Sequence, residues 1–419
     1  MGPLAEQHWR RRLADSGIYY GWFVVLASFV GQFAAFGTIY SFGVFFGHIV
    51  DAFGLSHANT AVVYSFQSVV IYVGGAVLGI VIDRYDVRRL FGLGSVLLVL
   101  GMAGASQLGT FTGVVLSYGL VAGVGIGLLY VIAYTAPVRW FERRRGLALG
   151  VATAGGGLGI LTMAPLSSWL IARLGWQTAY LYLSTGLFVV LALATVVLAE
   201  SPDALADASS SNGDDTLPAE SLRSQLSGAW KVASSPAFGL VLVGYLLGYT
   251  PVYVFQVHLV EHATVAGIGR SVGVLAVSVW GVANVVGKLS TGHAADRLRS
   301  SRVVIGSALV LGAVTIGIGL VGRASVLLGL MTVFAVTHAG LGALMSVLIS
   351  DLFGQEYLST LFGFAGLAFA LTGSVAPYLA GLSYDSFGTY TPAFVAAGLC
   401  CVLASAVLFA ATRIESRPA

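Results

Sequence analysis

Twelve apolar runs, each about 20 residues or longer, follow one another along this chain and dominate what it can fold into. Only helices satisfy their own backbone hydrogen bonds over runs of this length in lipid. With 9% charged residues, against about 25% in an average soluble domain, the chain lacks the polar surface of a soluble enzyme. The sequence therefore predicts an all-α membrane protein with twelve transmembrane helices. We expect them at residues 19–47, 59–82, 90–109, 112–138, 146–172, 177–199, 237–260, 270–293, 303–322, 325–350, 358–381 and 391–411.

A polar segment separates the sixth run from the seventh. Residues 200–235 contain several acidic side chains and the tract Ser209–Ser211, and they hold too few apolar residues to form a core. We expect a flexible cytoplasmic linker there. It divides the chain into an N-terminal six-helix bundle, residues 1–199, and a C-terminal six-helix bundle, residues 236–419.

Basic residues gather on one side of the predicted membrane. Seventeen of the 21 Lys and Arg residues fall in the two tails and the segments on their side, among them Arg10–Arg12. Arg173, Arg270 and Arg323 fall in loops on the other side, and Lys288 falls inside a run. Because cytoplasmic segments carry the excess of Lys and Arg, we expect a multi-pass protein of the cell membrane with both termini in the cytoplasm.

The two halves carry the same loop motif at an offset of 213 residues, which predicts two pseudo-symmetric bundles with a site between them near the membrane midplane. The motif places acid and base together at a cytoplasmic helix end, where a contact can form in one conformation and break in another. We therefore interpret it as a gating motif. The alternative is that its arginines only set the topology. Its residues are Gly79, Asp83 and Arg84, with Arg88 nearby, in the first half, and Gly292, Asp296 and Arg297 in the second.

Two strings of residues give the chain a resemblance to a known family. One comprises Gly123, Gly125, Gly127, Tyr130, Trp140, Phe141, Arg145–Ala148, Gly150, Gly155, Gly157, Gly159, Pro165, Gly175 and Trp176. The other comprises Asp351, Phe353, Gly354, Gly363, Pro377, Gly381, Asp385, Gly388, Tyr390 and Phe394. The chain resembles the major facilitator superfamily, and within it the oxalate/formate antiporter and monocarboxylate transporter branch. The resemblance implies transport of small carboxylates by alternating access.

The resemblance also implies positions for the substrate site. The helix-eight arginine that receives the carboxylate in monocarboxylate transporters corresponds to Lys288, aligned on the motif that ends at Arg297. An acid one turn earlier in the animal members corresponds to Asn284, and a helix-one lysine falls near Tyr40. The second cation of the oxalate exchanger, in helix eleven, has no counterpart in this sequence.

Lys288 is the charged residue that lies well inside a predicted span, with no acid predicted beside it. A charge at that depth costs about 3 kcal/mol and usually marks a transport pathway. The missing partner can be an anionic substrate. The alternative is that the lysine extends to the inner membrane interface, because it lies about 6 Å of helix rise from Gly292.

Other polar residues inside the spans are candidates for the same site. Asn284 lies one turn before Lys288 and shares its helix face with Trp280. His338, in helix ten, can bind substrate or take a proton as a neutral imidazole. For each candidate the alternative is a hydrogen bond to a neighbouring helix. The further candidates are Tyr40, Gln67, Tyr130 and Tyr134, and a stripe at Tyr245, Tyr249 and Tyr253 lines the cavity or packs.

These observations predict a secondary active transporter that moves a small monocarboxylate, similar to lactate, pyruvate or formate, by rocker-switch alternating access. Lys288 would hold the carboxylate, and a coupled proton is left open. The alternatives are an exporter of an uncharged or amphipathic compound, an oxalate/formate anion exchanger, or a non-transporting membrane receptor. The spans hold no paired acid and base, and Cys400 and Cys401 are adjacent, so we expect no enzyme activity, cofactor or metal. A net charge of +3 does not indicate nucleic acid, and we expect a monomer in the lipid bilayer.

Overall fold

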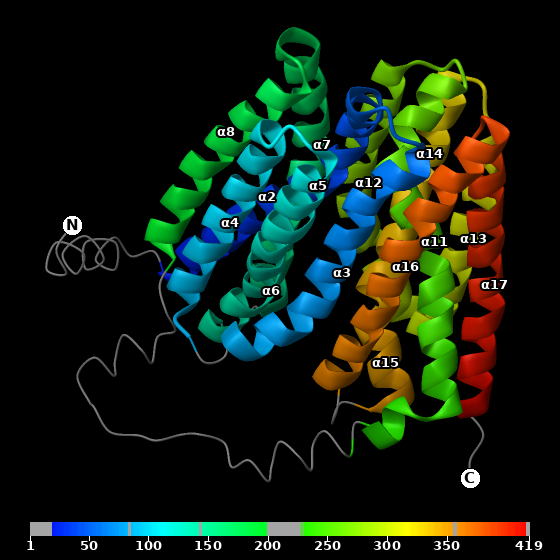
Figure 1. The fold of residues 1–419 in the computed structure, drawn as a ribbon. Coiled ribbons are helices and arrows are strands. Elements are labelled where there is room, and N and C mark those ends of the chain that lie inside the picture. Colours follow the sequence, from blue (N-terminus) through cyan, green and yellow to red (C-terminus); the bar gives the residue numbers. More distant parts are fainter. Residues whose placement is uncertain are drawn as a thin grey trace, which may run out of the picture.

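The computed structural model describes residues 19–82, 85–141, 145–198, 228, 230–354 and 358–415. Every regular element in this part of the chain is a helix (Figure 1). Eleven of its helical segments are long and apolar enough to cross a membrane, and α3 is a further helix of 26 residues. The prediction of an all-α membrane protein is therefore confirmed.

The six segments of the first half are α2 (Gly21–Phe53), α3 (His57–Ile82), α4 (Val87–Gln107), the series α5 (Phe111–Val114), η1 (Val115–Ala122) and α6 (Gly123–Trp140), α7 (Arg145–Leu174), and α8 (Trp176–Val197). Those of the second half are α11 (Pro236–Val265), α12 (Arg270–Leu298), α13 (Ser300–Leu320), α14 (Ala324–Ala343) with α15 (Met345–Phe353), α16 (Leu358–Phe387), and α17 (Thr391–Glu415).

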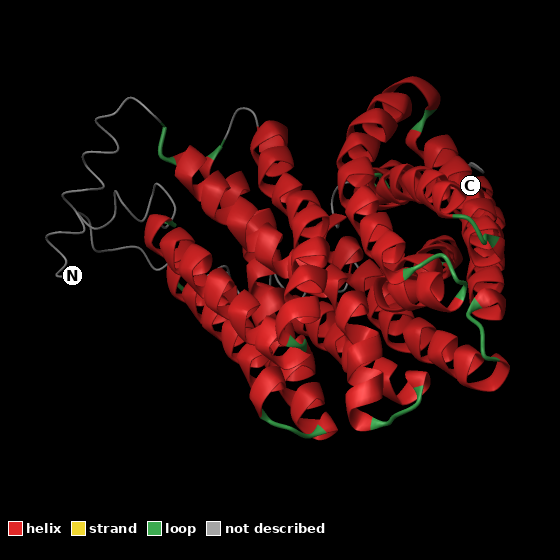
Figure 2. Cartoon of the chain, turned by 90° about the horizontal axis from the view of Figure 1, so that it is seen from above, coloured by secondary structure: helices red, strands yellow, loops and turns green. Residues whose placement is uncertain are grey.

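The helices of each half pack in the same pattern. In the first half α2 packs on α7, α4 on α8, and α3 on α6. In the second half the corresponding helices make the corresponding pairs, α11 with α16, α13 with α17, and α12 with α14. The repeat suggested by the loop motif is thus a repeat of packing, and the two bundles lie side by side when seen from above (Figure 2). Residues 200–227, which make up most of the predicted linker, lie outside the described residues.

The two halves meet through three helix pairs, α3 with α16, α7 with α12, and α2 with α11. We name the ends of the molecule the Tyr20 end, where α2 begins, and the His57 end, where α3 begins. In Figure 1 the bundles lean together at the His57 end, at the top, and diverge toward the Tyr20 end. The contacts between α3 and α16 run from Ala58 and Gly381 at the His57 end to the rings of Tyr72 and Phe369 near mid-span.

Glycine permits the closest approach between the halves. A Cβ atom added to Gly281 of α12 would lie 2.7 Å from both Gly157 O and Leu161 N of α7. A Cβ atom on Gly43 of α2 would lie 2.8 Å from Gln256 O of α11. Because these neighbours are backbone atoms, which cannot rotate away, the two helix pairs need glycine at these points.

Two of the membrane segments are not the continuous α-helices that the apolar runs predict. Residues 115–122 form a π-helical stretch between α5 and α6, at a place where Gly101 of α4 packs against its backbone. The tenth segment ends one helix at Ala343 and begins another at Met345, just after Gly340 and Gly342. Glycine lowers the free-energy cost of such irregularities. Its presence does not predict them, because glycines are also frequent in continuous membrane helices.

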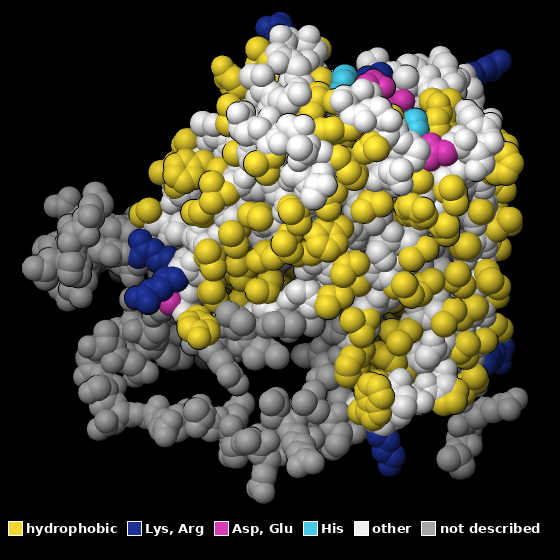
Figure 3. All heavy atoms as spheres, in the orientation of Figure 1, with side chains coloured by type: hydrophobic (Ala, Val, Ile, Leu, Met, Phe, Trp, Pro, Cys, Tyr) yellow, Lys and Arg dark blue, Asp and Glu magenta, His cyan; other side chains and the backbone are white. Residues whose placement is uncertain are grey.

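The surface has the polarity of a membrane protein. A broad band of hydrophobic side chains crosses the middle of the visible face, and most of its charged side chains lie toward the two ends (Figure 3). Leucine, valine and phenylalanine side chains of the membrane segments are exposed, for example Leu193 at 64% and Val286 at 56%. Such exposure would cost free energy in water and costs none against lipid.

Candidate functional site

A polar cluster lies between α12 and α14, near the middle of α12. The indole Nε1 of Trp280 and the amide Nδ2 of Asn284 both lie 3.2 Å from Nδ1 of His338. An indole N–H can only donate a hydrogen bond, so Nδ1 of His338 must accept it and carries no proton. His338 is therefore the neutral tautomer with its proton on Nε2, and that N–H is the donor it can offer to a ligand.

Lys288 lies one turn beyond Asn284, near enough to His338 to interact with it electrostatically. The opposite face of α12 meets lipid, since Val282 and Val286 are about half exposed. Lys288 comes two residues after Val286, which places the two side chains about 160° apart around the helix. The exposed side chain of Lys288 therefore faces the space between the halves rather than lipid. Among the side chains that the structure describes, no acid forms an ion pair with Lys288.

Aromatic rings of the first half lie against this cluster. The ring of Tyr40 packs edge-on against Trp280 of the second half, with centroids 4.7 Å apart. Phe36 lies 6.1 Å from Tyr40 and 6.0 Å from Tyr130, whose ring is 5.0 Å from that of Tyr134. Tyr40 and Trp280 are buried, whereas Phe36, Tyr130 and Tyr134 are half-buried and keep part of their surface free.

A second group of rings closes the other side. Tyr249 of α11 packs edge-on against His338, with centroids 5.6 Å apart, and lies 4.4 Å from Phe369 of α16. Phe369 in turn lies 5.7 Å from Tyr72 of α3. Tyr249 also interacts electrostatically with Tyr40 and Tyr134 of the first half, while its hydroxyl group lies against Gly342 of α14. Tyrosine residues of both halves therefore lie near one another in this region.

The structure brings six of the seven predicted substrate-binding residues to this region. They are Lys288, Asn284, His338, Tyr40, Tyr130 and Tyr134. Gln67 lies apart from them, fully buried, with its amide nitrogen donating to Tyr118 O of η1 at 3.0 Å. Its role in binding is a prediction that this placement does not test.

The sequence interpretation left four rings out of the site. Phe36, Tyr72 and Phe369 gave no signal, because an aromatic residue inside an apolar run has the same pattern whether it packs or lines a site. Tyr249 belonged to a predicted stripe of three tyrosines, which differ in burial in the structure. Its neighbours Tyr245 and Tyr253 are buried, while Tyr249 is half-buried and faces His338.

The predicted gating motif is described only in part. Asp83 and Arg84 lie outside the described residues, as do the side chain of Asp296 and the surroundings of Gly79 and Gly292. Arg88 donates from Nε to Thr195 O of α8 at 3.1 Å, which joins two helices of the first half. Arg297 is exposed at the end of α12.

Charged residues join the halves at the His57 end. The carboxylate of Asp385, on α16, accepts the backbone N–H groups of His57 and Ala58 at 2.9 Å each, where α3 begins. Arg270, on α12, donates to Val44 O of α2 at 2.8 Å and lies 3.8 Å from Glu261 of α11. A carboxylate at a helix N-terminus is favoured both by the free N–H groups and by the helix dipole. We call these contacts the His57-end lock.

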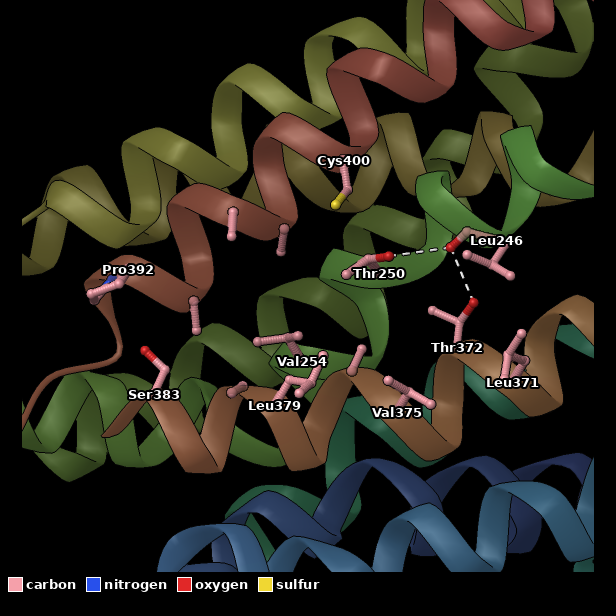
Figure 4. A pocket seen from close by; sticks show the side chains of 15 residues that line it. Leu246, Thr250, Val254, Leu371, Thr372, Val375, Leu379, Ser383, Pro392 and Cys400 are labelled. Carbon is pink, nitrogen blue, oxygen red and sulfur yellow. Dashed lines mark hydrogen bonds between the residues drawn. The ribbon is translucent and has the colours of Figure 1, made fainter. Parts of the chain in front are cut away.

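A separate cavity of about 490 Å³ lies within the second half, between α11, α16 and α17 (Figure 4). Its lining is almost entirely apolar, and the hydroxyls of Thr250 and Thr372 are both bonded to Leu246 O. None of the predicted site residues lines it. Among the described residues no group of His, Cys, Asp and Glu side chains could hold a metal ion.

Comparison with known proteins agrees with this architecture. The model of the Major Facilitator Superfamily matches residues 28–277 and 263–419. Monocarboxylate transporter 13 of Bos taurus is 27% identical over 96% of this chain and 91% of its own length. Monocarboxylate transporter 2 of Mus musculus is 24% identical over 95% of this chain and 85% of its own length. A bacterial homologue of the human lysosomal transporter Spinster, solved in an inward-facing and unoccupied conformation, has the same fold, with a TM-score of 0.75 at 14% identity over 96% of this chain and 99% of its own.

Proposed function

The chain belongs to the Major Facilitator Superfamily, and we propose that it is a secondary active transporter of a small monocarboxylate, which it binds at Lys288. It is a multi-pass membrane protein, and its curated relatives are named as monocarboxylate transporters rather than as enzymes. The observation that carries the proposal is the lysine that faces the interface between the halves with no acid paired to it among the described side chains. A carboxylate supplies the missing charge.

Two donors would hold that carboxylate. The ammonium group of Lys288 supplies the charge, and the Nε2–H of His338 supplies a neutral hydrogen bond. Hydrogen bonds to charged groups contribute about 1.5–3 kcal/mol each. Lysine is a compact charge without the planar fork of arginine, so the orientation of the carboxylate would depend on His338 as well as on Lys288.

The arrangement of the halves supports alternating access. The His57-end lock and the close packing of α3 on α16 hold the halves together on one side of the site. Because Lys and Arg concentrate in the segments of the Tyr20 end, that end would face the cytoplasm, with both termini. The structure would then be the state in which the substrate reaches Lys288 from the cytoplasm, and breaking the lock would open the other side.

Uptake into proteoliposomes tests the proposal. We expect labelled pyruvate, lactate, formate or acetate to enter vesicles that contain the full-length chain, and Lys288→Ala to lower uptake at least tenfold, since a charged hydrogen bond is lost. The chain has two lysines, so Lys231→Ala, an exposed position at the Tyr20 end, is the matched control and should transport normally. Undiminished uptake by Lys288→Ala, or no uptake of any carboxylate by the parent chain, would refute the proposal.

The same vesicles separate the coupling modes. An inward proton gradient should accelerate uptake if the substrate moves with a proton. Preloading with unlabelled carboxylate should accelerate it if the protein exchanges anions. An exporter of uncharged or amphipathic compounds would show no competition by any carboxylate.

A further inference from the structure

We propose that the monocarboxylate carried by this protein has an aromatic body, which lies against the rings at the interface of the halves, beside His338 and Lys288. The inference rests on the proposed function and concerns the part of the substrate beyond its carboxylate. The rings form one set, which we call the aromatic cluster. It comprises Phe36, Tyr40, Tyr72, Tyr130, Tyr134, Tyr249, Trp280 and Phe369.

The cluster is built from both halves and encloses the polar groups. Tyr40 contacts Trp280 across the interface, and Tyr72 contacts Phe369 across it on the other side. Trp280 and Tyr249 each pack against His338, which interacts electrostatically with Lys288. A ligand whose carboxylate binds Lys288 and His338 therefore has aromatic rings beside it in both halves.

The free surface of the cluster is aromatic. Phe36, Tyr72, Tyr130, Tyr134, Tyr249 and Phe369 are half-buried although they lie deep in the membrane segments. Tyr72 and Phe369 contact each other across the interface, and Tyr130 interacts electrostatically with Tyr249 of the other half, so the free surface of these rings borders the space between the halves. The ring faces carry negative potential and the ring edges positive, so this wall favours the edges and faces of another ring.

A small aliphatic acid would use little of this wall. Formate has no body at all, and lactate offers one methyl group and one hydroxyl. Aromatic pairs add to affinity beyond the apolar area that they bury, and a tyrosine hydroxyl can also donate a hydrogen bond to a keto or hydroxyl group on the ligand. The chemistry points to an aryl-substituted acid such as phenylacetate or phenylpyruvate.

Equilibrium binding to the purified full-length chain in detergent tests this inference without depending on transport. By isothermal titration, phenylacetate should bind with a Kd about tenfold lower than that of acetate, the factor that one good aromatic pair supplies. Cyclohexylacetate, a saturated body of similar size, should bind more weakly than phenylacetate. Phenylacetamide, which keeps the ring and lacks the charge, should also bind more weakly.

Variants of Tyr130 connect the preference to the cluster. Tyr130→Leu should remove most of the advantage of phenylacetate over acetate, whereas Tyr130→Phe, which keeps the ring, should retain it. Lys231→Ala, which lies outside the cluster, should bind both acids as the parent chain does. A loss of the preference that Tyr130→Leu and Tyr130→Phe share would come from the hydroxyl rather than from the ring, and would contradict the aromatic contact.

The outcomes separate the two proposals. If phenylacetate binds no better than acetate while pyruvate uptake still requires Lys288, the aromatic body is refuted and monocarboxylate transport stands. If cyclohexylacetate equals phenylacetate, the site selects an apolar body and the inference is likewise refuted. If no carboxylate binds or moves, the proposed function fails.

Discussion

The interface between the halves is built by different chemistry at its two levels. At the His57 end the contacts are charged and paired, with Asp385 on the N-terminus of α3 and Arg270 between Glu261 and Val44 O. At mid-membrane the contacts are aromatic, and the cation Lys288 has no acid paired to it among the described side chains. Ion pairs and hydrogen bonds that are complete within the protein can stabilise one conformation, whereas a cation without a partner can bind an anionic ligand. The contacts at the His57 end would therefore control access to the site, and those around Lys288 would control binding.

The largest effect is expected when the cation of the binding site is removed, which tests whether Lys288 binds the substrate. Lys288→Met keeps the apolar stem of the side chain and should lower kcat/KM for pyruvate about 100-fold, because a charge-assisted contact contributes about 1.5–3 kcal/mol. Lys288→Arg restores the charge and should recover most of the loss. Initial rates of uptake in proteoliposomes measure both. A Met variant as active as the Arg variant would show that charge is not what the site supplies.

The next effect concerns the His57-end lock. Asp385→Asn should weaken the hold on the two N–H groups of α3 and shift the population toward the state open at that end by about tenfold. Maleimide labelling of a cysteine placed at Ser68, which is buried between α3 and α16, would report this opening. Asp86→Asn is the matched control, because Asp86 caps α4 within one half. Equal labelling in both variants would mean that Asp385 does not hold the halves together.

A smaller effect is expected at His338, and it sharpens the assignment of its tautomer. His338→Gln offers an acceptor for Trp280 and a donor for the substrate, and should keep pyruvate KM within about threefold. His338→Phe leaves both functions empty and should raise KM about tenfold, the cost of an unsatisfied buried donor. Uptake measured against pH adds a second readout. If His338 carries the coupled proton, the Gln variant would lose its dependence on the proton gradient.

The smallest effect on transport is expected at Gln67. Its amide joins α3 to Tyr118 O within the first half, so Gln67→Leu should lower the melting temperature by a few degrees while KM changes less than twofold. Thermal unfolding in detergent and uptake kinetics on the same preparation would separate the two effects. An altered KM at unchanged stability would instead support the predicted contact with substrate.

Much of the fold could be predicted because lipid restricts the backbone to one solution. The apolar runs and the charged loops determine where each helix lies, and the predicted 270–293 and 303–322 correspond to α12 and α13. The π-helical stretch at 115–122 and the break after Ala343 could not be predicted, since hydropathy does not register how a helix is wound.

The site was only partly predictable for a related reason. Lys288 stands out because a charge inside a span is costly, and polar residues such as His338 and Asn284 stand out for the same reason. An aromatic ring has no free-energy penalty in lipid or in a protein core. The sequence therefore does not indicate that Phe36 and Phe369 lie beside the site. Contacts between distant residues, such as Asp385 with the start of α3, depend on packing that one sequence does not display.

The glycine contact between α7 and α12 has a mechanical consequence. Where Gly157 and Gly281 meet, the two backbones approach closely, and the side chain of Val285 on α12 packs on Gly157. Large interlocked side chains would have to disengage and repack whenever the halves rotate, which adds a barrier to every cycle. A close backbone contact with only a small side chain seated on it leaves little to disengage when the halves rotate. These two residues would therefore form the fulcrum of the rocking motion, with Lys288 carried on the same helix two turns away.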